Sequence, residues 1–128
     1  MSAMSDYLEN EILDHILATA SYTAPATVYV GLSTGSFGDD NSGTELAGSG
    51  YGRVAASFGA AASGTASNDA AIEFSAASGS WGTVSHFGLF DASTSGNLLI
   101  HGALTSSKVI ETGDILKVAI GDMDISAD

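Results

Sequence analysis

The sequence predicts a mainly β fold: an antiparallel β-sandwich or jelly roll with one amphipathic helix at the N-terminus. Three observations lead to this prediction. An apolar stripe with helical spacing precedes Pro25, short β-branched runs follow it, and turns rich in Gly, Ser, Asn and Asp separate these runs. A chain of 128 residues has the size of one compact unit. Within that unit we expect the helix and its connector at residues 1–24 and the β-domain at residues 25–128.

The helix is expected to run from Ser5 to about Ala20. Five large apolar side chains recur on one stripe, namely Leu8, Ile12, Leu13, Ile16 and Leu17. Ser5 is suited to the N-cap position, and the acidic residues of the first turn complement the positive end of the helix dipole. Pro25 disfavours helical backbone in the residue before it, so the helix should end in the segment that leads to this proline.

About seven short strands are expected after the helix, at spacings typical of an antiparallel β-sandwich or jelly roll. They are residues 26–34, 51–58, 70–74, 81–91, 98–104, 108–112 and 115–121. Residues 33–50 form a long polar loop between the first two strands. The alternating return of Val, Ile, Leu and Phe indicates a folded β-domain, despite the many small residues.

Residues 81–91, WGTVSHFGLFD, lack a polar face. Strict alternation puts Trp81, Thr83, Ser85, Phe87 and Leu89 on one side and Gly82, Val84, His86, Gly88 and Phe90 on the other. The neighbouring strand 98–104 has the same property, so the hairpin needs a second cover, either the helix or another chain. We favour another chain for part of this surface. The expected contact residues are Leu8, Ile12 and Ile16 on the helix and Trp81, Phe87, Phe90 and His101 on the hairpin.

The charge balance excludes several partners. The chain has fifteen acidic residues and only three basic ones, Arg53, Lys108 and Lys117, which gives a formal net charge of -12. Phosphate backbones and anionic membranes are bound by clustered cations, so we expect neither nucleic acid nor a membrane as partner. The apolar runs are too short to span a bilayer. The chain has no cysteine, so no disulfide is available.

The loop 33–50 contains one candidate metal site. Asp39, Asn41 and Glu45, with Asp40 beside them, carry the oxygen ligands that calcium prefers. The spacing departs from the EF-hand pattern, because Gly43 stands where a ligand should be. The alternative interpretation is a solvated loop in an acidic protein, so no cofactor is expected.

The histidines allow a second candidate site. His86 and His101 lie on strands joined by a short turn, and Asp91 is the nearest further ligand in the sequence. Histidines packed in the hairpin are the alternative. The chain also lacks the GxSxG motif of a nucleophile elbow, and no carboxylate pair stands out. We therefore expect that the protein is not an enzyme.

Several stretches of the sequence, taken in order, resemble one family. They are YLENEILDHIL, YTAPATVYVGLST, GYGRVAASF, SNDAAIEF, WGTVSHFGLFDASTSGNLLIHGAL and ETGDILKVAIGDMDI. Together they resemble the small bacteriophage virion proteins of the tail-fibre-like (Gp80-like) family, over almost the whole chain. The resemblance implies a structural protein of the virion with a compact β fold, made in the host bacterial cytoplasm. A chain without long fibre repeats would also suit a capsid decoration or cement protein.

The expected function is therefore that of a structural accessory protein that decorates or cements the particle surface, at the capsid or the tail. It should self-associate, with a homotrimer as the expected oligomer, and contact other virion proteins such as the major capsid or tail proteins. The main alternative is a receptor- or carbohydrate-binding module of a tail fibre, in which Tyr51 and the loop 35–50 contact sugar. A small hydrolase that uses His86 or His101 is a weaker alternative.

Overall fold

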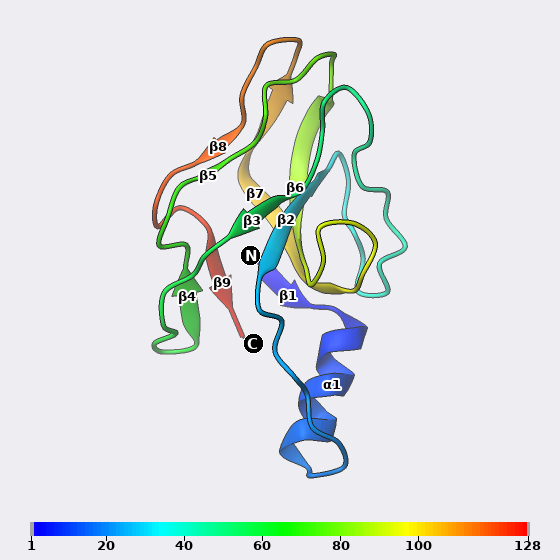
Figure 1. Cartoon of the computed structure of the whole chain (residues 1–128), viewed down its shortest axis with the longest axis vertical. Helices are drawn as coiled ribbons and strands as arrows, with labels where there is room; N and C mark the ends of the chain where they lie inside the picture. Colours follow the sequence, from blue (N-terminus) through cyan, green and yellow to red (C-terminus); the bar gives the residue numbers. More distant parts are fainter. Residues whose placement is uncertain (1, 128) are drawn as a thin grey trace.

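The computed structural model describes residues 2–127, and a five-stranded antiparallel sheet forms its centre (Figure 1). In spatial order, its strands are β1 (Ser2–Met4), β7 (Leu98–Ile110), β6 (Gly82–Phe90), β2 (Val28–Ser33) and β3 (Val54–Ala56). Two short antiparallel ribbons accompany the sheet: β4 (Thr65–Ser67) pairs with β9 (Asp124–Ser126), and β5 (Ile72–Glu73) pairs with β8 (Lys117–Val118). The predicted mainly β, antiparallel fold is confirmed. Ribbons and connecting segments stand where a full second sheet of a sandwich would lie.

The helix α1 (Asp6–Ile16) is confirmed near the N-terminus, but it is shorter than expected. Ser5 is the N-cap, as predicted: its side-chain oxygen accepts a hydrogen bond from the Leu8 N–H at 3.2 Å. The helix ends about one turn early because Ala18 adopts a left-handed backbone conformation with φ of 62°. In Figure 1, α1 projects away from the strands beyond β1.

The main core lies between one face of the sheet and the segments that carry the two ribbons. Val30 and Leu32 on β2 stand beside Leu89 and Phe87 on β6, and the antiparallel register pairs them directly. Side chains from the later segments cover these residues, namely Ile72, Phe74, Leu116, Met123 and Ile125. Burial of this apolar surface is the main force that holds the ribbons against the sheet.

The opposite face of the sheet is covered by the same chain. Phe37, in the loop after β2, packs edge to face against Phe90, with ring centroids 5.6 Å apart. Two glycines make this close approach possible: Gly31 on β2 pairs with Gly88 on β6. A Cβ atom at Gly88 would lie 2.9 Å from a Leu98 methyl group and 3.2 Å from the Phe37 ring. The predicted need for a cover on both faces is thus met within the chain, and the preference for another chain was wrong here.

The strict alternation expected along residues 81–91 is also wrong. Val84, Phe87 and Leu89 all belong to the main core, although Val84 and Phe87 are three residues apart. The pairing between β6 and β7 shifts register between Val84 and His86, where β7 contains three more residues than β6. Such an irregularity reverses the side to which the following residues point. The sequence gives no local signal for it.

Candidate interaction surface

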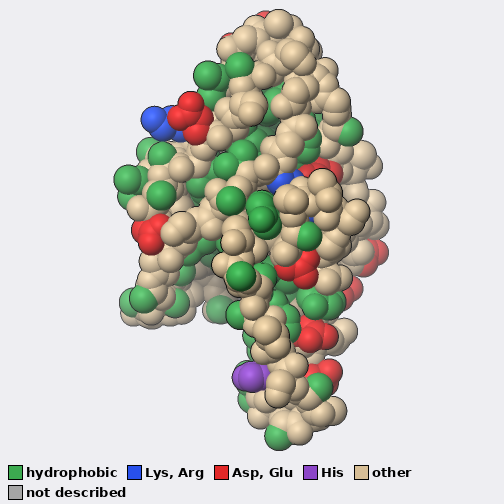
Figure 2. Space-filling model, viewed as in Figure 1, with side chains coloured by type: hydrophobic (Ala, Val, Ile, Leu, Met, Phe, Trp, Pro, Cys, Tyr) green, Lys and Arg blue, Asp and Glu red, His purple; other side chains and the backbone are tan. Residues whose placement is uncertain are grey.

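The outer face of α1 is a large apolar surface that the chain leaves uncovered. Leu13 is 55% exposed, Ile16 is 70% exposed and Leu17, the C-cap, is 69% exposed. Leu8 is buried and Ile12 is half-buried, because that side of the helix faces the sheet. The helix is anchored at its start, where the Ser5 hydroxyl donates to the Leu98 carbonyl at 2.5 Å. Figure 2 shows hydrophobic and acidic side chains together on this projecting end. We call this surface, Leu13, Ile16 and Leu17, the outer helix face.

The expected contact residues of the hairpin lie inside the protein. Trp81, Phe87 and Phe90 are buried in the two core clusters. The Trp81 indole N–H donates to the Ser49 carbonyl at 2.9 Å, which fixes the end of the polar loop. His101 is partly exposed, and its Nε2 lies 2.7 Å from the Asp39 carboxylate. Among the seven predicted contact residues, Ile16 is therefore the one that presents a large apolar surface to solvent.

The candidate calcium ligands are directed to different partners. Glu45 is bound by Arg53, and Asp39 is bound by His101. Asp40 accepts a hydrogen bond from the Ser42 N–H at 3.1 Å, and its hydrogen bonds with Ser42 lower the pKa of Asp40. Over residues 2–127, no three His, Cys, Asp or Glu side chains form a group that could hold a metal ion. The loop is thus organised by internal hydrogen bonds, and the predicted calcium set is not assembled.

The second candidate metal set is also separated. His86 Nδ1 lies 2.7 Å from the Ser85 hydroxyl, whereas His101 pairs with Asp39. Asp91 closes the turn between β6 and β7, where its carboxylate accepts from the Asn97 N–H at 2.7 Å and from the Asn97 amide at 3.0 Å. Each of these three predicted residues therefore has a structural partner of its own.

Arg53 joins two loops over the covered face of the sheet, a role that our reading of the sequence missed. Its guanidinium forms a bidentate pair with Glu45, at 2.8 and 2.9 Å, and stacks 3.6 Å above the Phe90 ring. It also donates to the carbonyls of Ala92 and Ser95 in the β6–β7 turn, at 2.9 and 2.7 Å. A chain with one arginine and an acid eight residues before it carries a weak signal for such a pair.

Tyr51 is part of the same cluster and is only partly exposed. Its hydroxyl donates to Glu45 and accepts from the Leu32 N–H at 2.9 Å. The ring packs edge to face against Trp81, with centroids 5.5 Å apart. Burial raises the pKa of Tyr51, and the hydrogen bond to Glu45 raises it further, so the hydroxyl remains a donor. The sequence interpretation needed an exposed Tyr51 to contact sugar. The structure instead packs Tyr51 against Trp81 and bonds its hydroxyl to Glu45 and Leu32.

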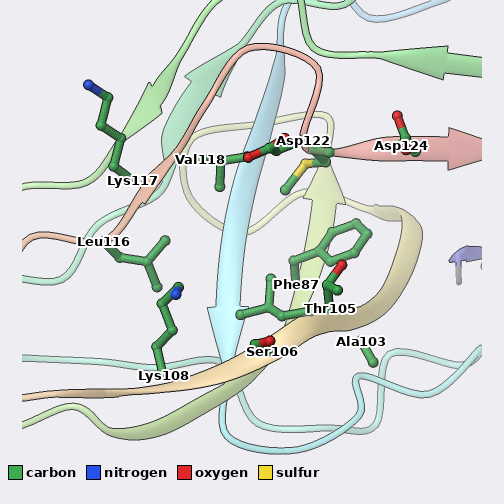
Figure 3. Close-up of a pocket in the computed structure, with 12 residues that line it drawn as sticks. Phe87, Ala103, Thr105, Ser106, Lys108, Leu116, Lys117, Val118, Asp122 and Asp124 are labelled. Carbon is green, nitrogen blue, oxygen red and sulfur yellow. The ribbon is translucent and has the colours of Figure 1, made fainter.

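A groove of about 580 Å³ opens between the middle of β7 and the segment that carries β8 and β9. Phe87, Leu104, Leu116 and Met123 contribute apolar surface to it. Thr105, Ser106 and Lys108 on β7 and Asp122 across the groove contribute polar groups, as Figure 3 shows. The sequence could not reveal this groove, because its walls are distant along the chain and meet only in the fold.

The fold and the surface together define a small antiparallel β-domain with one projecting, apolar-faced helix. Between residues 2 and 127, no helix has the length and apolarity needed to cross a membrane. The chain belongs to the family described as podophage GP4 fiber I protein gp80, which matches residues 3–126. This match confirms the resemblance seen in the sequence and makes the chain a bacteriophage structural protein of the fibre type. None of the curated proteins compared with the chain matches it.

Proposed function

We propose that this protein is a non-catalytic accessory component of the phage particle that self-associates through the outer helix face. Contacts to other virion proteins, such as the major capsid or tail proteins, then fix it to the particle surface. The observation that carries this proposal is the exposure of Leu13, Ile16 and Leu17 on a helix that projects from the β-domain. Synthesis in the host cytoplasm and assembly as a trimer belong to the same proposal.

Burial of the outer helix face would contribute part of the free energy that assembly requires. Complete burial of a Leu or Ile side chain contributes about 1.5–3 kcal/mol. The three side chains of the outer helix face are each more than half exposed, so a covering chain would gain roughly 3–6 kcal/mol from them. A projecting helix of 11 residues gains little stability from its own sequence, so tertiary or intermolecular packing must stabilise its free end.

Binding of a carbohydrate receptor is the second candidate function. The Tyr51 ring packs against Trp81, so we assign this function to the groove beside β7 in place of Tyr51 and the loop 35–50. The groove presents the hydroxyls of Thr105 and Ser106 and the amine of Lys108, which are groups that can hydrogen-bond to sugars. Binding of glycans by the purified protein, abolished by Lys108→Ala, would support this candidate.

The self-association proposal is tested by replacing the outer helix face with Leu13→Ser, Ile16→Ser and Leu17→Ser together. The chain offers a matched control, because Val109, Ile115 and Ile120 are also 61%, 52% and 66% exposed but lie outside the helix. Sedimentation velocity should show an oligomer for the unmodified protein and for the control triple variant, and a monomer for the helix variant. An equal effect of the two triple variants would contradict the proposal. Circular dichroism checks that each variant remains folded.

A further inference from the structure

We infer that the outer helix face of one copy docks in the groove beside β7 of a second copy. This inference rests on the proposed self-association and names the surface that receives the helix. It is carried by the direction of α1 in its own chain, by the apolar lining of the groove, and by the location of the exposed cations.

A helix cannot reach the groove of its own chain. β1 runs antiparallel to β7, with Ser2 opposite Gly102 and Met4 opposite Ile100. The chain therefore moves toward the start of β7 as it approaches α1, and Ser5 bonds to Leu98. The groove lies in the other direction along β7, at residues 103–108. Any helix that fills it must come from another molecule.

The lining of the groove offers apolar contacts to the edge of a helix. Each wall carries one half-buried apolar side chain, Leu104 on the sheet and Val118 on the facing segment, above the buried side chains of Phe87, Leu116 and Met123. The helix α1 is 11 residues long, or about 16 Å. Its apolar side chains at Leu13 and Ile16 are three residues apart and project from neighbouring positions on one side. Insertion of this edge would cover apolar surface on both molecules.

Two exposed acids, Asp6 and Glu9, lie on the same side of α1 as the outer helix face, and Glu9 is the nearer of the two to Leu13 and Ile16. Glu9 lies four residues before Leu13 and seven before Ile16, so it stands on the same side of the helix as these two residues. A partner that covers them must also cover the Glu9 carboxylate. Burial of a carboxylate without a cation is costly, so the receiving surface should supply one.

The exposed cations of this chain are located at the groove. Of its three Lys and Arg residues, Arg53 has a side chain that is only 8% exposed and is paired with Glu45. Lys108 and Lys117 are exposed, both line the groove, and neither is in an ion pair within residues 2–127. Figure 3 shows the Lys108 side chain extending toward Leu116, across the groove, whereas Lys117 points away from it. Lys108 is therefore the partner for Glu9.

The two acidic side chains that line the groove, Asp122 and Asp124, are directed away from Lys108. Asp124 accepts a hydrogen bond from Ser67 and points away from Phe87 in Figure 3. Asp122 lies beside Val118, apart from Lys108, in the same view. A helix whose Glu9 meets Lys108 thus need not place its carboxylate against Asp122 or Asp124.

The charge of Glu9 also disfavours the simplest alternative, a bundle in which the outer helix faces of several copies pack together. That arrangement would bring the Glu9 carboxylates of the copies close to one another, and like charges in contact repel. Helix-in-groove contacts join two different surfaces instead. Such head-to-tail contacts close into rings when the rotation between copies permits, as in a trimer.

The test is a charge exchange between Glu9→Lys and Lys108→Glu, measured by sedimentation equilibrium of the full chain. Each single variant should weaken self-association by about tenfold or more, and the double variant should return to within about threefold of the unmodified protein. Asp14→Lys and Lys117→Glu are matched controls. They make the same changes in net charge, but Asp14 lies on another side of α1 and Lys117 points away from the groove. Both controls should self-associate normally.

The outcomes separate this inference from the proposed function. If the double variant is as weak as the two single effects combined, or if Lys108→Glu behaves like Lys117→Glu, the groove is not the receiving surface. If the triple serine variant of Leu13, Ile16 and Leu17 nevertheless loses self-association, the proposed function stands and only the receiving surface is wrong. A monomeric unmodified protein at about 100 µM would overturn the inference.

Discussion

Replacing Arg53 by Met tests whether the charged cluster holds the polar loop on the sheet. The guanidinium side chain is only 8% exposed, and Glu45 is 23% exposed. Met keeps an unbranched apolar side chain over the Phe90 ring, so the main loss is the charge and its hydrogen bonds. Arg53→Met leaves the Glu45 carboxylate without its cation beside the Tyr51 hydroxyl.

The expected cost follows from the burial of this pair. Removal of one partner from a buried ion pair typically costs about 3–5 kcal/mol, because the remaining charge is uncompensated. Glu45 keeps some contact with water, so the low end of this range, about 3 kcal/mol, applies. Adding Glu45→Gln removes the uncompensated charge and should recover about 1–3 kcal/mol, a typical coupling energy for residues in contact.

The assay is urea unfolding of the four proteins in this double-mutant cycle, followed by tryptophan fluorescence. Trp81, the only tryptophan, packs against Tyr51 and therefore reports directly on the loop. A loss of less than about 1 kcal/mol for Arg53→Met, the level of an exposed ion pair, would refute the account of this cluster. Additive effects of the two replacements would refute it as well.

Two further predictions concern the same face of the sheet. Gly88→Ala should lower the free energy of unfolding by about 1–3 kcal/mol, because the added methyl group would lie within 3.2 Å of Leu98, Phe90 and Phe37. Gly52→Ala is the control and should change stability little, because the space at its Cβ is open. Stability should also fall as the pH rises above about 10, since the raised pKa of Tyr51 in the folded state means that the unfolded chain loses this proton first. Urea unfolding across this pH range should show a weaker decline for Tyr51→Phe, and an unchanged decline would contradict the role assigned to burial.

The sequence predicted those elements whose signals are local. Ser5 was identified as the N-cap of α1 because capping depends on a few neighbouring residues. The strand expected at 81–91 was close to the observed β6 (Gly82–Phe90), since a run of large apolar residues in a small domain is most often a buried strand. Glycine-rich turns marked the connections around these elements. In each case, a short window of sequence contained the physical reason.

The missed elements depend on pairing between distant segments. β1, β4 and β9 have three residues each, and nothing in such short segments distinguishes them from loops. The strands expected at 98–104 and 108–112 form one irregular strand, β7, because both ends pair with β6. The strand expected at 115–121 reduces to Lys117–Val118, where β5 is its partner.

The candidate contact residues show the same difference between local signals and contacts of distant segments. Amphipathic spacing correctly indicated a helix with an apolar stripe, but it could not show that Leu8 faces the sheet while Ile16 faces solvent. For the hairpin, an apolar composition was taken as a sign of a neighbouring chain. The cover came from Phe37, in a loop whose polar composition gave no reason to expect it.

The most direct test of the central claim is an image of the intact phage particle at side-chain resolution. We predict that α1 of this protein lies against a neighbouring chain, with Leu13, Ile16 and Leu17 covered and Glu9 next to a lysine. A particle in which the β-domain is attached but the outer helix face of α1 is in contact only with solvent would contradict it.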